Sequence, residues 1–252
     1  MADGIVVLVA MNAELIHLRR LASSETAVAI DRWDGYDLSI GSRQITAVHA
    51  GIGMLNAAAA TERTIAVLSP RIVLNYGCAG AHHREINPGD LVIGERTVNG
   101  TSLNVLRDSS EAHNGRGYGV SGDVIFPAVI DADPNLIAVA QKVARGYRIE
   151  HWPDSAVEAR LRLGPVLSSD IWTQALERLD VLHDRHGSLA EDMEAAAIAH
   201  VCLLHDVPFL TVKDISNNEY HRASDLSEFS DFPTAEIGKR AASFVRSLIE
   251  SI

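Results

Sequence analysis

Acidic and small side chains stand where a predicted strand ends or a predicted helix begins. Glu14 follows the apolar run of residues 5–10, and Cys78 lies in the small-residue segment 77–80. In open α/β sheets, ligands bind where strands end and loops begin. A carboxylate such as Glu14 could act there as a general base, because it accepts a proton and carries a negative charge.

Other candidates share a position beside a glycine turn, a helix start or a strand end: Ile52, Gly53, Met193, Glu194, Lys213, Ser216 and Asn217. Glu14 and Glu194 also have a plainer interpretation, as first-turn helix carboxylates that the helix dipole stabilises. On residue types alone, a small-molecule enzyme and a binding domain both remain open.

The sequence contains no complete motif for binding a dinucleotide cofactor or a metal ion. The pair Gly51 and Gly53 lacks the third glycine of the dinucleotide fingerprint, because Asn56 stands there. His82 and His83 have no HExxH motif or Cys/His cluster around them, so we expect solvated loop histidines. Cys78 needs a nearby base to act as a nucleophile, and a small buried residue is the alternative. We expect no cofactor and no metal.

Composition narrows the class of protein. The chain has 252 residues, 47% of them hydrophobic, and a net charge of −11. An acidic chain without a run of lysine and arginine residues is a poor partner for nucleic acid. No run approaches the ~18 apolar residues of a membrane span. The start of the chain lacks the positive region of a signal peptide, and the two cysteines form no close pattern, so we expect a cytoplasmic protein.

The elements that must position these residues alternate along the chain. Apolar, β-branched runs predict strands at 5–10, 72–76, 90–93, 161–167 and 207–212, with a hairpin at 36–48. Helical spacing predicts helices at 11–21, 56–68, 134–143, 173–182, 192–205 and 234–250. Residues 97–130 are irregular and read as a long loop. This order predicts one α/β domain over residues 1–252 with a mixed sheet.

The motifs, taken in order, resemble the nucleosidase branch of the purine nucleoside phosphorylase superfamily. The likeness is strongest to 5′-methylthioadenosine/S-adenosylhomocysteine nucleosidases. It is carried by Ala10-Met11 with Glu14, residues 50–53, 75–80, 88–90, 167–170, 192–202 and 207–209, and Ile215-Ser216. The segment 192–202 is the densest match. The resemblance implies a three-layer α/β/α sandwich around a twisted mixed sheet, and a homodimer.

The resemblance also implies an activity, the hydrolysis of the N-glycosidic bond of a purine nucleoside. Glu14 matches the carboxylate that activates water, and Glu194 matches the one that binds the ribose hydroxyls, with Met193 beside the sugar. Trp172 falls where the family stacks an aromatic ring on the purine, although core packing is an equal alternative. Ser216 and Asn217 match the base site, and Ile52, Gly53, Cys78 and Lys213 match the residues that support the water and the loop.

Some positions depart from the family pattern. Lys213 stands where the family has an arginine, and Cys78 where it has a small hydroxyl residue. Asn217 stands where adenine-releasing nucleosidases carry an aspartate that protonates N7, and an amide cannot transfer a proton in that way. Futalosine hydrolases and phosphorylases of 6-oxopurines also have an asparagine there. Asp214 has the opposite strand parity, so we do not expect it to substitute.

Two further positions indicate which molecule acts as the nucleophile. The superfamily's phosphorylases bind phosphate with arginines, and the corresponding places here hold Glu14 and Asn75. A glutamate would repel the phosphate dianion, so water is the expected nucleophile. A 6-oxopurine (futalosine) hydrolase, a purine nucleoside phosphorylase and a non-catalytic nucleoside-binding domain remain as alternatives. The 5′ pocket would be lined by residues 97–130 and by the region of Leu226.

Overall fold

The computed structural model describes residues 3–113, 118–119, 125–126, 128–153, 155–224 and 234–252, with only the backbone at 118–119 and 125–126. The strands are β1 (Ile5–Val9), β2 (Ser24–Ile30), β3 (Trp33–Ile40), β4 (Arg43–His49), β5 (Ile72–Ala81), β6 (Leu91–Asn99), β7 (Asn104–Val105), β8 (Glu111–Ala112), β9 (Tyr118–Gly119), β10 (Ile125–Phe126), β11 (Val129–Asp131), β12 (Leu161–Ser168), β13 (Ala190–Asp192) and β14 (Phe209–Asn217). The helices are α1 (Asn12–Leu21), α2 (Met54–Leu68), α3 (Pro134–Ala144), α4 (Leu176–His186), α5 (Ala195–Leu204) and α6 (Lys239–Ser251).

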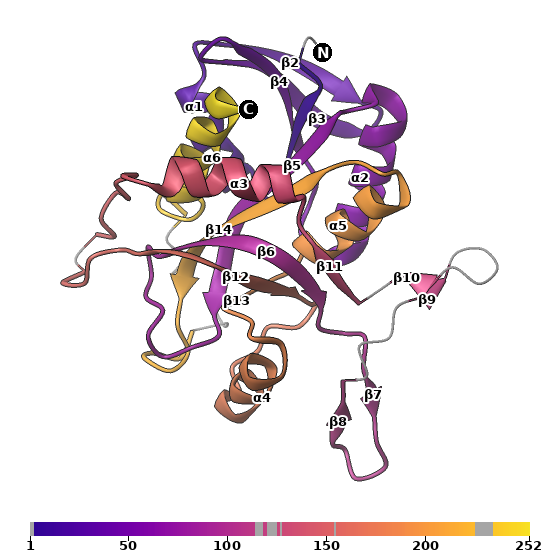
Figure 1. Ribbon diagram of the computed structural model, residues 1–252, viewed down its shortest axis with the longest axis vertical. Helices are drawn as coiled ribbons and strands as arrows, with labels where there is room; N and C mark the ends of the chain where they lie inside the picture. The colour runs from indigo at the N-terminus through magenta and orange to yellow at the C-terminus, as the bar shows by residue number, and fades with distance from the viewer. Residues whose placement is uncertain (1–2, 114–117, 120–124, 127, 154, 225–233) are drawn as a thin grey trace.

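A ten-stranded mixed sheet forms the centre of the molecule (Figure 1). Its strand order is β11-β6-β12-β13-β5-β1-β4-β3-β2, and β14 pairs with both β5 and β6. The strands β6, β12, β13, β5 and β14 therefore pair in a closed ring. Closing a sheet in this way leaves no free edge among these five strands. The predicted mixed sheet is confirmed, and the ring is a feature that the sequence patterns did not indicate.

Helices cover both faces of the sheet, as expected of an α/β/α sandwich. Buried residues of α1, α3 and α6 pack on one face, and those of α2 and α5 pack on the other. In Figure 1, α2 and α5 lie to the right of the sheet, and α1 and α6 lie to its upper left. All five residues of β1 are buried, which explains its continuous apolar run.

Several strands are longer than their apolar runs predict. The strand predicted at 72–76 does not end before the small-residue segment 77–80, because β5 continues through that segment to Ala81. Likewise, β14 does not end near residue 212 but reaches Asn217. The two strands pair in parallel along their length, from Phe209 opposite Val73 to Asn217 opposite Gly80. This non-local pairing overrides the weak strand propensity of small and polar residues.

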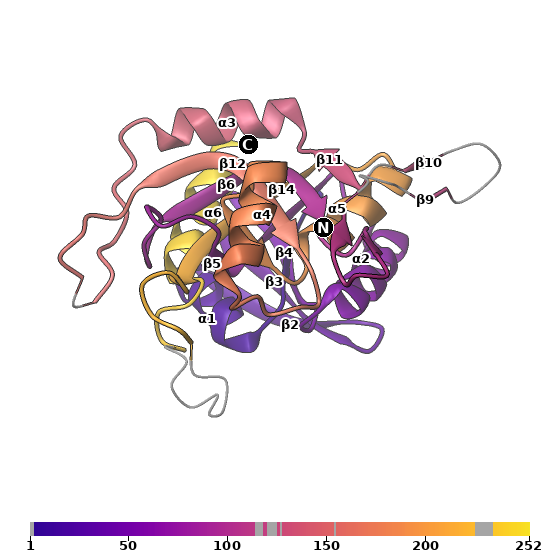
Figure 2. The same ribbon diagram turned by 90° about the horizontal axis from the view of Figure 1, so that it is seen from below.

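Two other expectations were wrong. Residues 192–194 are not helical. The strand β13 pairs with both β5 and β12, and for this reason α5 begins only at Ala195. Residues 97–130 are not one loop, since β6 runs to Asn99 and short hairpin strands follow it. The β7–β8 hairpin projects away from the sheet in Figure 1. Figure 2, seen from below, shows α4 lying across the same end of the molecule.

The remaining elements match more closely. The predicted helix at 134–143 is α3, and the side chain of Asp133 accepts hydrogen bonds from the backbone N–H groups of Asn135 and Leu136, as a capping residue should. The helices α4 and α6 begin three and five residues later than predicted, at Leu176 and Lys239. Among the described residues, no helix has the length and apolarity that crossing a membrane requires.

Candidate active site

A cavity of about 660 Å³ lies where β5 and β14 end and α1 and α5 begin. It collects eight of the ten residues that the sequence singled out: Glu14, Ile52, Cys78, Trp172, Met193, Glu194, Ser216 and Asn217. The other two stand just behind the lining. Gly53 donates its N–H to Glu194, and Lys213 forms an ion pair with Asp192.

Glu14 is held as a buried carboxylate at the start of α1. One carboxylate oxygen, Oε1, accepts a hydrogen bond of 2.7 Å from the Cys78 N–H, and Oε2 accepts one of 3.1 Å from the Met11 N–H. A Cβ on Gly77 would lie 2.8 Å from Oε1, so that position requires glycine. Burial raises the pKa of Glu14, and the Cys78 N–H and Lys213 partly offset this effect. A raised pKa suits a general base.

Cys78 shares this corner of the cavity but is not a thiolate. Burial and the neighbouring Glu14 carboxylate raise the pKa of its thiol well above the usual range. The thiolate is the nucleophilic form of cysteine, so Cys78 is unsuited to nucleophilic attack. Its backbone N–H holds Glu14, and its thiol donates to the same carboxylate.

Lys213 and Asp192 form a buried ion pair beneath the cavity. Their side chains are 1% and 0% exposed, and Nζ lies 2.7 Å from Oδ2. Asp192 also accepts hydrogen bonds from the Ser168 hydroxyl and the Ala195 N–H. Burial opposes the charge on Lys213, but the Asp192 and Glu194 carboxylates raise its pKa. Glu14, Asp192 and Glu194 thus surround one lysine, which leaves the site acidic.

Glu194 precedes α5 as its N-cap residue, and its side chain does not cap the helix. Instead, Oε1 accepts a 2.9 Å hydrogen bond from the Gly53 N–H across the cavity wall. The interpretation of Glu194 as a first-turn helix carboxylate is therefore wrong. Burial and the nearby Asp192 carboxylate raise the pKa of Glu194 to about 8. Its carboxyl group points into the cavity beside Met193, where it is free to bind hydroxyl groups.

Asn217 lines the cavity at the end of β14, where it pairs with Gly80 of β5. Its Nδ2 donates a 3.0 Å hydrogen bond to Glu219, and its Oδ1 accepts a 2.9 Å hydrogen bond from the Ser216 hydroxyl. Trp172 is 37% exposed and lines the cavity, so it is not a core residue. Asp214 does not line the cavity. It accepts a hydrogen bond from the Arg240 N–H on the other face of β14, as its strand parity predicts.

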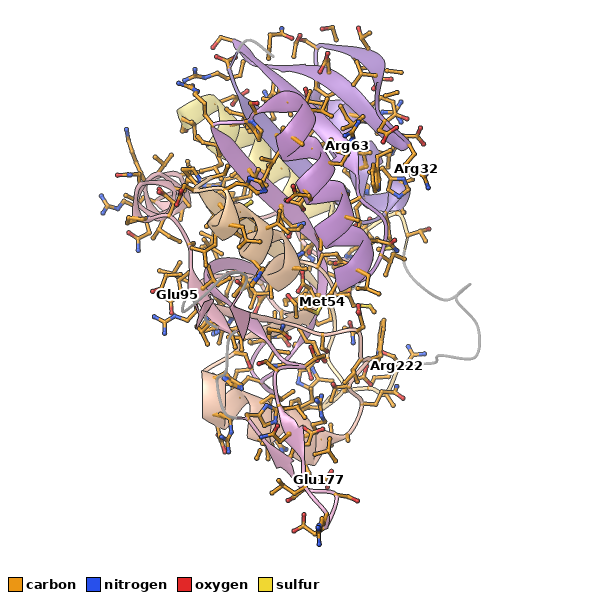
Figure 3. All side chains as sticks on the ribbon, turned by 90° about the vertical axis from the view of Figure 1, so that its right-hand side faces the viewer. Arg32, Met54, Arg63, Glu95, Glu177 and Arg222 are labelled. Carbon is orange, nitrogen blue, oxygen red and sulfur yellow. The ribbon has the colours of Figure 1, made fainter. Side chains whose placement is uncertain are left out.

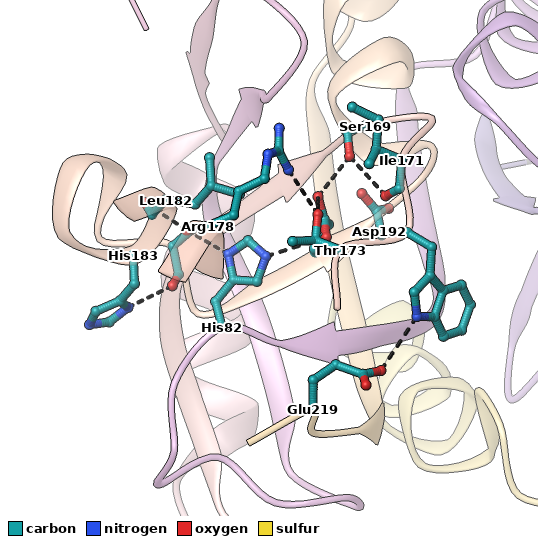
Figure 4. A network of polar contacts seen from close by, with 12 residues as sticks. His82, Ser169, Ile171, Thr173, Arg178, Leu182, His183, Asp192 and Glu219 are labelled. Carbon is teal, nitrogen blue, oxygen red and sulfur yellow. Dashed lines mark hydrogen bonds and ion pairs between the residues drawn. The ribbon is translucent and has the colours of Figure 1, made fainter. Parts of the chain in front are cut away.

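Three polar residues of the cavity were missed or misjudged: Glu219, Glu191 and His82. His82 is fully buried, not solvated, and bonds the Ser188 hydroxyl at 2.8 Å. Glu191 accepts a 2.7 Å hydrogen bond from Ser169 and lies 3.6 Å from the His82 ring (Figure 4). Only pairing between β13 and β5 brings them together, so no local pattern could have placed them.

The described lining of the cavity is rich in acidic side chains. It contains six carboxylates, from Glu14, Asp170, Glu191, Asp192, Glu194 and Glu219, and no arginine or lysine among the described residues. The described part of the chain also has no group of three side chains suited to hold a metal ion. Such a lining repels phosphate and favours neutral or cationic ligands with many hydrogen-bond donors.

The sandwich around a ringed mixed sheet, with this cavity at its strand ends, is the architecture of a known class. The chain belongs to the phosphorylase superfamily, whose family model matches residues 4–250. It is 26% identical over 249 residues to the 5′-methylthioadenosine/S-adenosylhomocysteine nucleosidase of Oceanobacillus iheyensis, a match that covers 96% of this chain and 97% of that protein.

Solved structures agree with this assignment. The nucleosidase of the same name from Neisseria meningitidis, in complex with methylthio-immucillin-A, aligns with a TM-score of 0.77 at 25% identity and covers 98% of this chain and 99% of its own. The futalosine hydrolase of Helicobacter pylori aligns with a TM-score of 0.79 at 20% identity and covers 98% of this chain and 97% of its own. This second likeness concerns the fold alone.

Proposed function

We propose that this protein is a purine nucleosidase, which hydrolyses the N-glycosidic bond of a purine nucleoside to the free base and a ribosyl product. Its relatives are nucleosidases acting on methylthioadenosine and S-adenosylhomocysteine by name. The observation that carries the proposal is the cavity, whose lining brings together Glu14, Glu194 and Asn217.

Each residue has a role in this proposal. Glu14 takes a proton from water as the water oxygen attacks C1′, and the C1′–N9 bond breaks with its electron pair leaving on the purine. Asn217 donates a hydrogen bond to the departing base, which takes its proton from solvent water. The acidic lining stabilises the positive charge that grows on the sugar. Glu194 binds the ribose hydroxyls, since a carboxylate accepts two strong O–H···O bonds, and Met193 packs beside the sugar. Trp172 stacks on the base.

Water is the proposed nucleophile, not phosphate. The six carboxylates and the absence of arginine and lysine from the described lining favour hydrolysis over phosphorolysis. A 6-oxopurine nucleoside such as futalosine is the second candidate substrate. It is favoured by Asn217, whose amide donates a hydrogen bond to the base but does not act as an acid. No cofactor enters this mechanism.

We further propose a homodimer in the cytoplasm. Leu55 on α2 is 83% exposed, and Ile52, which lines the cavity, is 50% exposed. Val105 and Leu106 are also exposed, while the side chains of Tyr118, Ile125 and Phe126, and Leu226, lie outside the described residues. Exposed apolar side chains beside a cavity favour a protein interface. The two unpaired cysteines fit a reducing compartment.

The test is a panel of purine nucleosides, assayed for base release by chromatography with and without phosphate. We expect release that does not depend on phosphate, with no sugar phosphate formed. Glu14→Gln should keep the shape of the site but lower the rate by about 10²–10⁴, because the base is lost. Phosphate-dependent turnover, or near-normal activity of a folded Glu14→Gln protein, would contradict the mechanism.

A further inference from the structure

Glu191 is a carboxylate of the cavity to which the proposed mechanism gives no role. It stands on β13, and the chain holds only one of its two carboxylate oxygens. Oε1 accepts hydrogen bonds from the Ser169 hydroxyl at 2.7 Å and from the Thr173 hydroxyl at 3.3 Å (Figure 4). Among the described residues, no hydrogen bond reaches Oε2. This second oxygen is therefore an open acceptor in the lining of the cavity.

The ring of His82 stands beside this open oxygen. Its Nε2 lies 3.6 Å from Oε2 of Glu191, which is beyond hydrogen-bonding distance. His82 is fully buried, and its Nε2 has no hydrogen-bond partner in the part of the chain that the structure describes. A buried polar atom without a partner costs free energy. This part of the cavity thus contains polar groups that the described chain leaves unsatisfied.

The carboxyl group of Glu191 is ionised at neutral pH. Burial opposes its negative charge, but His82 and the two hydroxyl groups together lower its pKa. Glu14 and Glu194 differ in this respect, because burial raises their pKa values. An ionised carboxylate only accepts hydrogen bonds, and bonds to a charged acceptor are the stronger ones. Oε2 consequently suits a ligand that brings an N–H donor to this place.

Strand pairing places Glu191 and Asn217 on either side of Gly80. Gly80 of β5 pairs with Glu191 of β13 on one side and with Asn217 of β14 on the other. Paired residues point to the same face of a sheet, and two strand spacings separate the flanking backbones by about 10 Å. Because Gly80 has no side chain between them, a flat ring fits over it with one edge toward each neighbour.

A purine in this place would turn its position 2 toward Glu191. N7 and position 6 lie on one edge of a purine, and position 2 lies on the edge across the ring. In the proposed mechanism, Asn217 donates a hydrogen bond to the departing base at the edge that carries N7. An amino group at position 2 then supplies the N–H that Oε2 lacks, whereas a hydrogen atom there leaves the carboxylate oxygen unsatisfied.

We propose that Glu191 is a specificity-determining residue that accepts an N–H of a 2-amino group, so that 2-aminopurine nucleosides of the guanine type are the preferred substrates. This inference rests on the proposed function only in assuming that the cavity binds a purine with Asn217 at its N7 edge. It concerns position 2 of the base, and it applies whether position 6 carries an oxygen or an amino group.

Free bases test the inference without any catalytic step. Calorimetry should measure the binding of two matched pairs, purine with 2-aminopurine and adenine with 2,6-diaminopurine. The members of each pair differ only in the 2-amino group. We expect the wild-type protein to bind the 2-amino member about 10–100-fold more tightly, by the same factor in both pairs. Equal binding within either pair, or no binding of any of the four bases, would overturn the inference.

Glu191→Gln should abolish the preference for the 2-amino group. The hydroxyl groups of Ser169 and Thr173 hold the amide oxygen in the place of Oε1, so the amide NH₂ takes the place of Oε2 and meets the 2-amino group as a second donor. Glu191→Asp keeps the charge but withdraws it by one methylene group, and should reduce the preference to a few-fold. Melting temperatures should confirm that both variants are folded. A folded Glu191→Gln protein that keeps the wild-type preference would contradict the assignment.

The matched control is Glu219→Gln, which removes the same charge from the same cavity. Both carboxylate oxygens of Glu219 already accept hydrogen bonds, from the Asn217 amide and from Ser224 among others, so Glu219 offers no open acceptor. Its variant should change the affinities for both members of a pair by the same factor. An equal loss of the 2-amino preference in Glu191→Gln and Glu219→Gln would refute the contact, because the preference would then reflect only the charge of the cavity.

The inference and the proposed function fail in different ways. If nucleosides are hydrolysed but the preference for a 2-amino group does not respond to Glu191, the inference is wrong and the nucleosidase stands. If the preference follows Glu191 but no nucleoside is cleaved, the contact with the base is correctly assigned and the proposed hydrolysis is wrong.

Discussion

At the scale of single residues, the carboxylates of Glu14 and Glu194 differ in their surroundings. Glu14 receives two backbone N–H groups, whereas Glu194 receives one and faces the charge of Asp192. Both have raised pKa values because they are buried, and the charge of Lys213 partly compensates both. An anionic site of this kind is poorly satisfied when empty and is complementary to a sugar that becomes cationic.

Glu194 should therefore reduce the stability of the empty protein while serving the ligand. Its pKa is about 8 in the fold, against an ordinary value of 4.5, so the folded state binds the proton more tightly. The stability that Glu194 contributes is complete below the lower value and is lost as the pH rises through the upper one. The neutral side chain of Glu194→Gln does not titrate and so does not lose this stability. We therefore expect the melting temperature of the variant, relative to that of the wild type, to rise between about pH 5 and about pH 8.

Whereas the Glu194→Gln substitution should raise the melting temperature, it should lower the catalytic efficiency. Above about pH 8, where Glu194 is ionised in the fold, loss of the charged acceptor should lower kcat/KM by about 10–100-fold, because hydrogen bonds to a charged group are the stronger ones. Thermal melts at both pH values and steady-state kinetics on the same preparations check the two effects together. A variant that melts below the wild type at the higher pH would mean that Glu194 supports the fold instead.

At the scale of elements, the ion pair of Lys213 on β14 and Asp192 on β13 joins the two strands beneath the site. Lys213→Met leaves Asp192 buried and unpaired, and should lower the free energy of unfolding by about 3–5 kcal/mol. Lys213→Arg keeps the positive charge and should therefore lower the free energy of unfolding by less. Lys239→Met breaks the exposed pair with Glu150 and should cost at most about 1 kcal/mol in the same urea titrations. Similar losses in the Lys213→Met and Lys239→Met variants would refute the buried pair.

Local patterns predicted the elements whose stability is local. The buried run of β1 and the helix that follows it placed Glu14 correctly, because five buried residues and a helical repeat leave a clear signal. Glu194 was assigned to a helix because residues 192–205 favour one, whereas pairing of β13 with distant strands delays the helix. Glu219 was missed for the same reason, since its place depends on β14 extending to Asn217 along β5.

At the scale of the whole molecule, the open question is what covers the apolar side chains beside the cavity. Leu55 lies near the start of α2, one residue beyond Met54, whose N–H bonds Asp170 in the same segment as Trp172. Figure 3 labels Met54 on the side of the molecule where α2 and α5 face the viewer. Leu55 is 83% exposed at this place, which suits the interface of the proposed homodimer.

Leu55→Glu should therefore dissociate the proposed homodimer. Light scattering at micromolar concentration should give about twice 27.2 kDa for the wild type and about 27.2 kDa for the variant. KM should rise with dissociation, because Ile52 links this surface to the cavity. Val67→Glu, at a 47% exposed position in the last turn of the same helix, adds the same charge far from the cavity and should remain a dimer with unchanged KM. A wild-type protein that is monomeric and fully active would show that the cavity is complete within one chain.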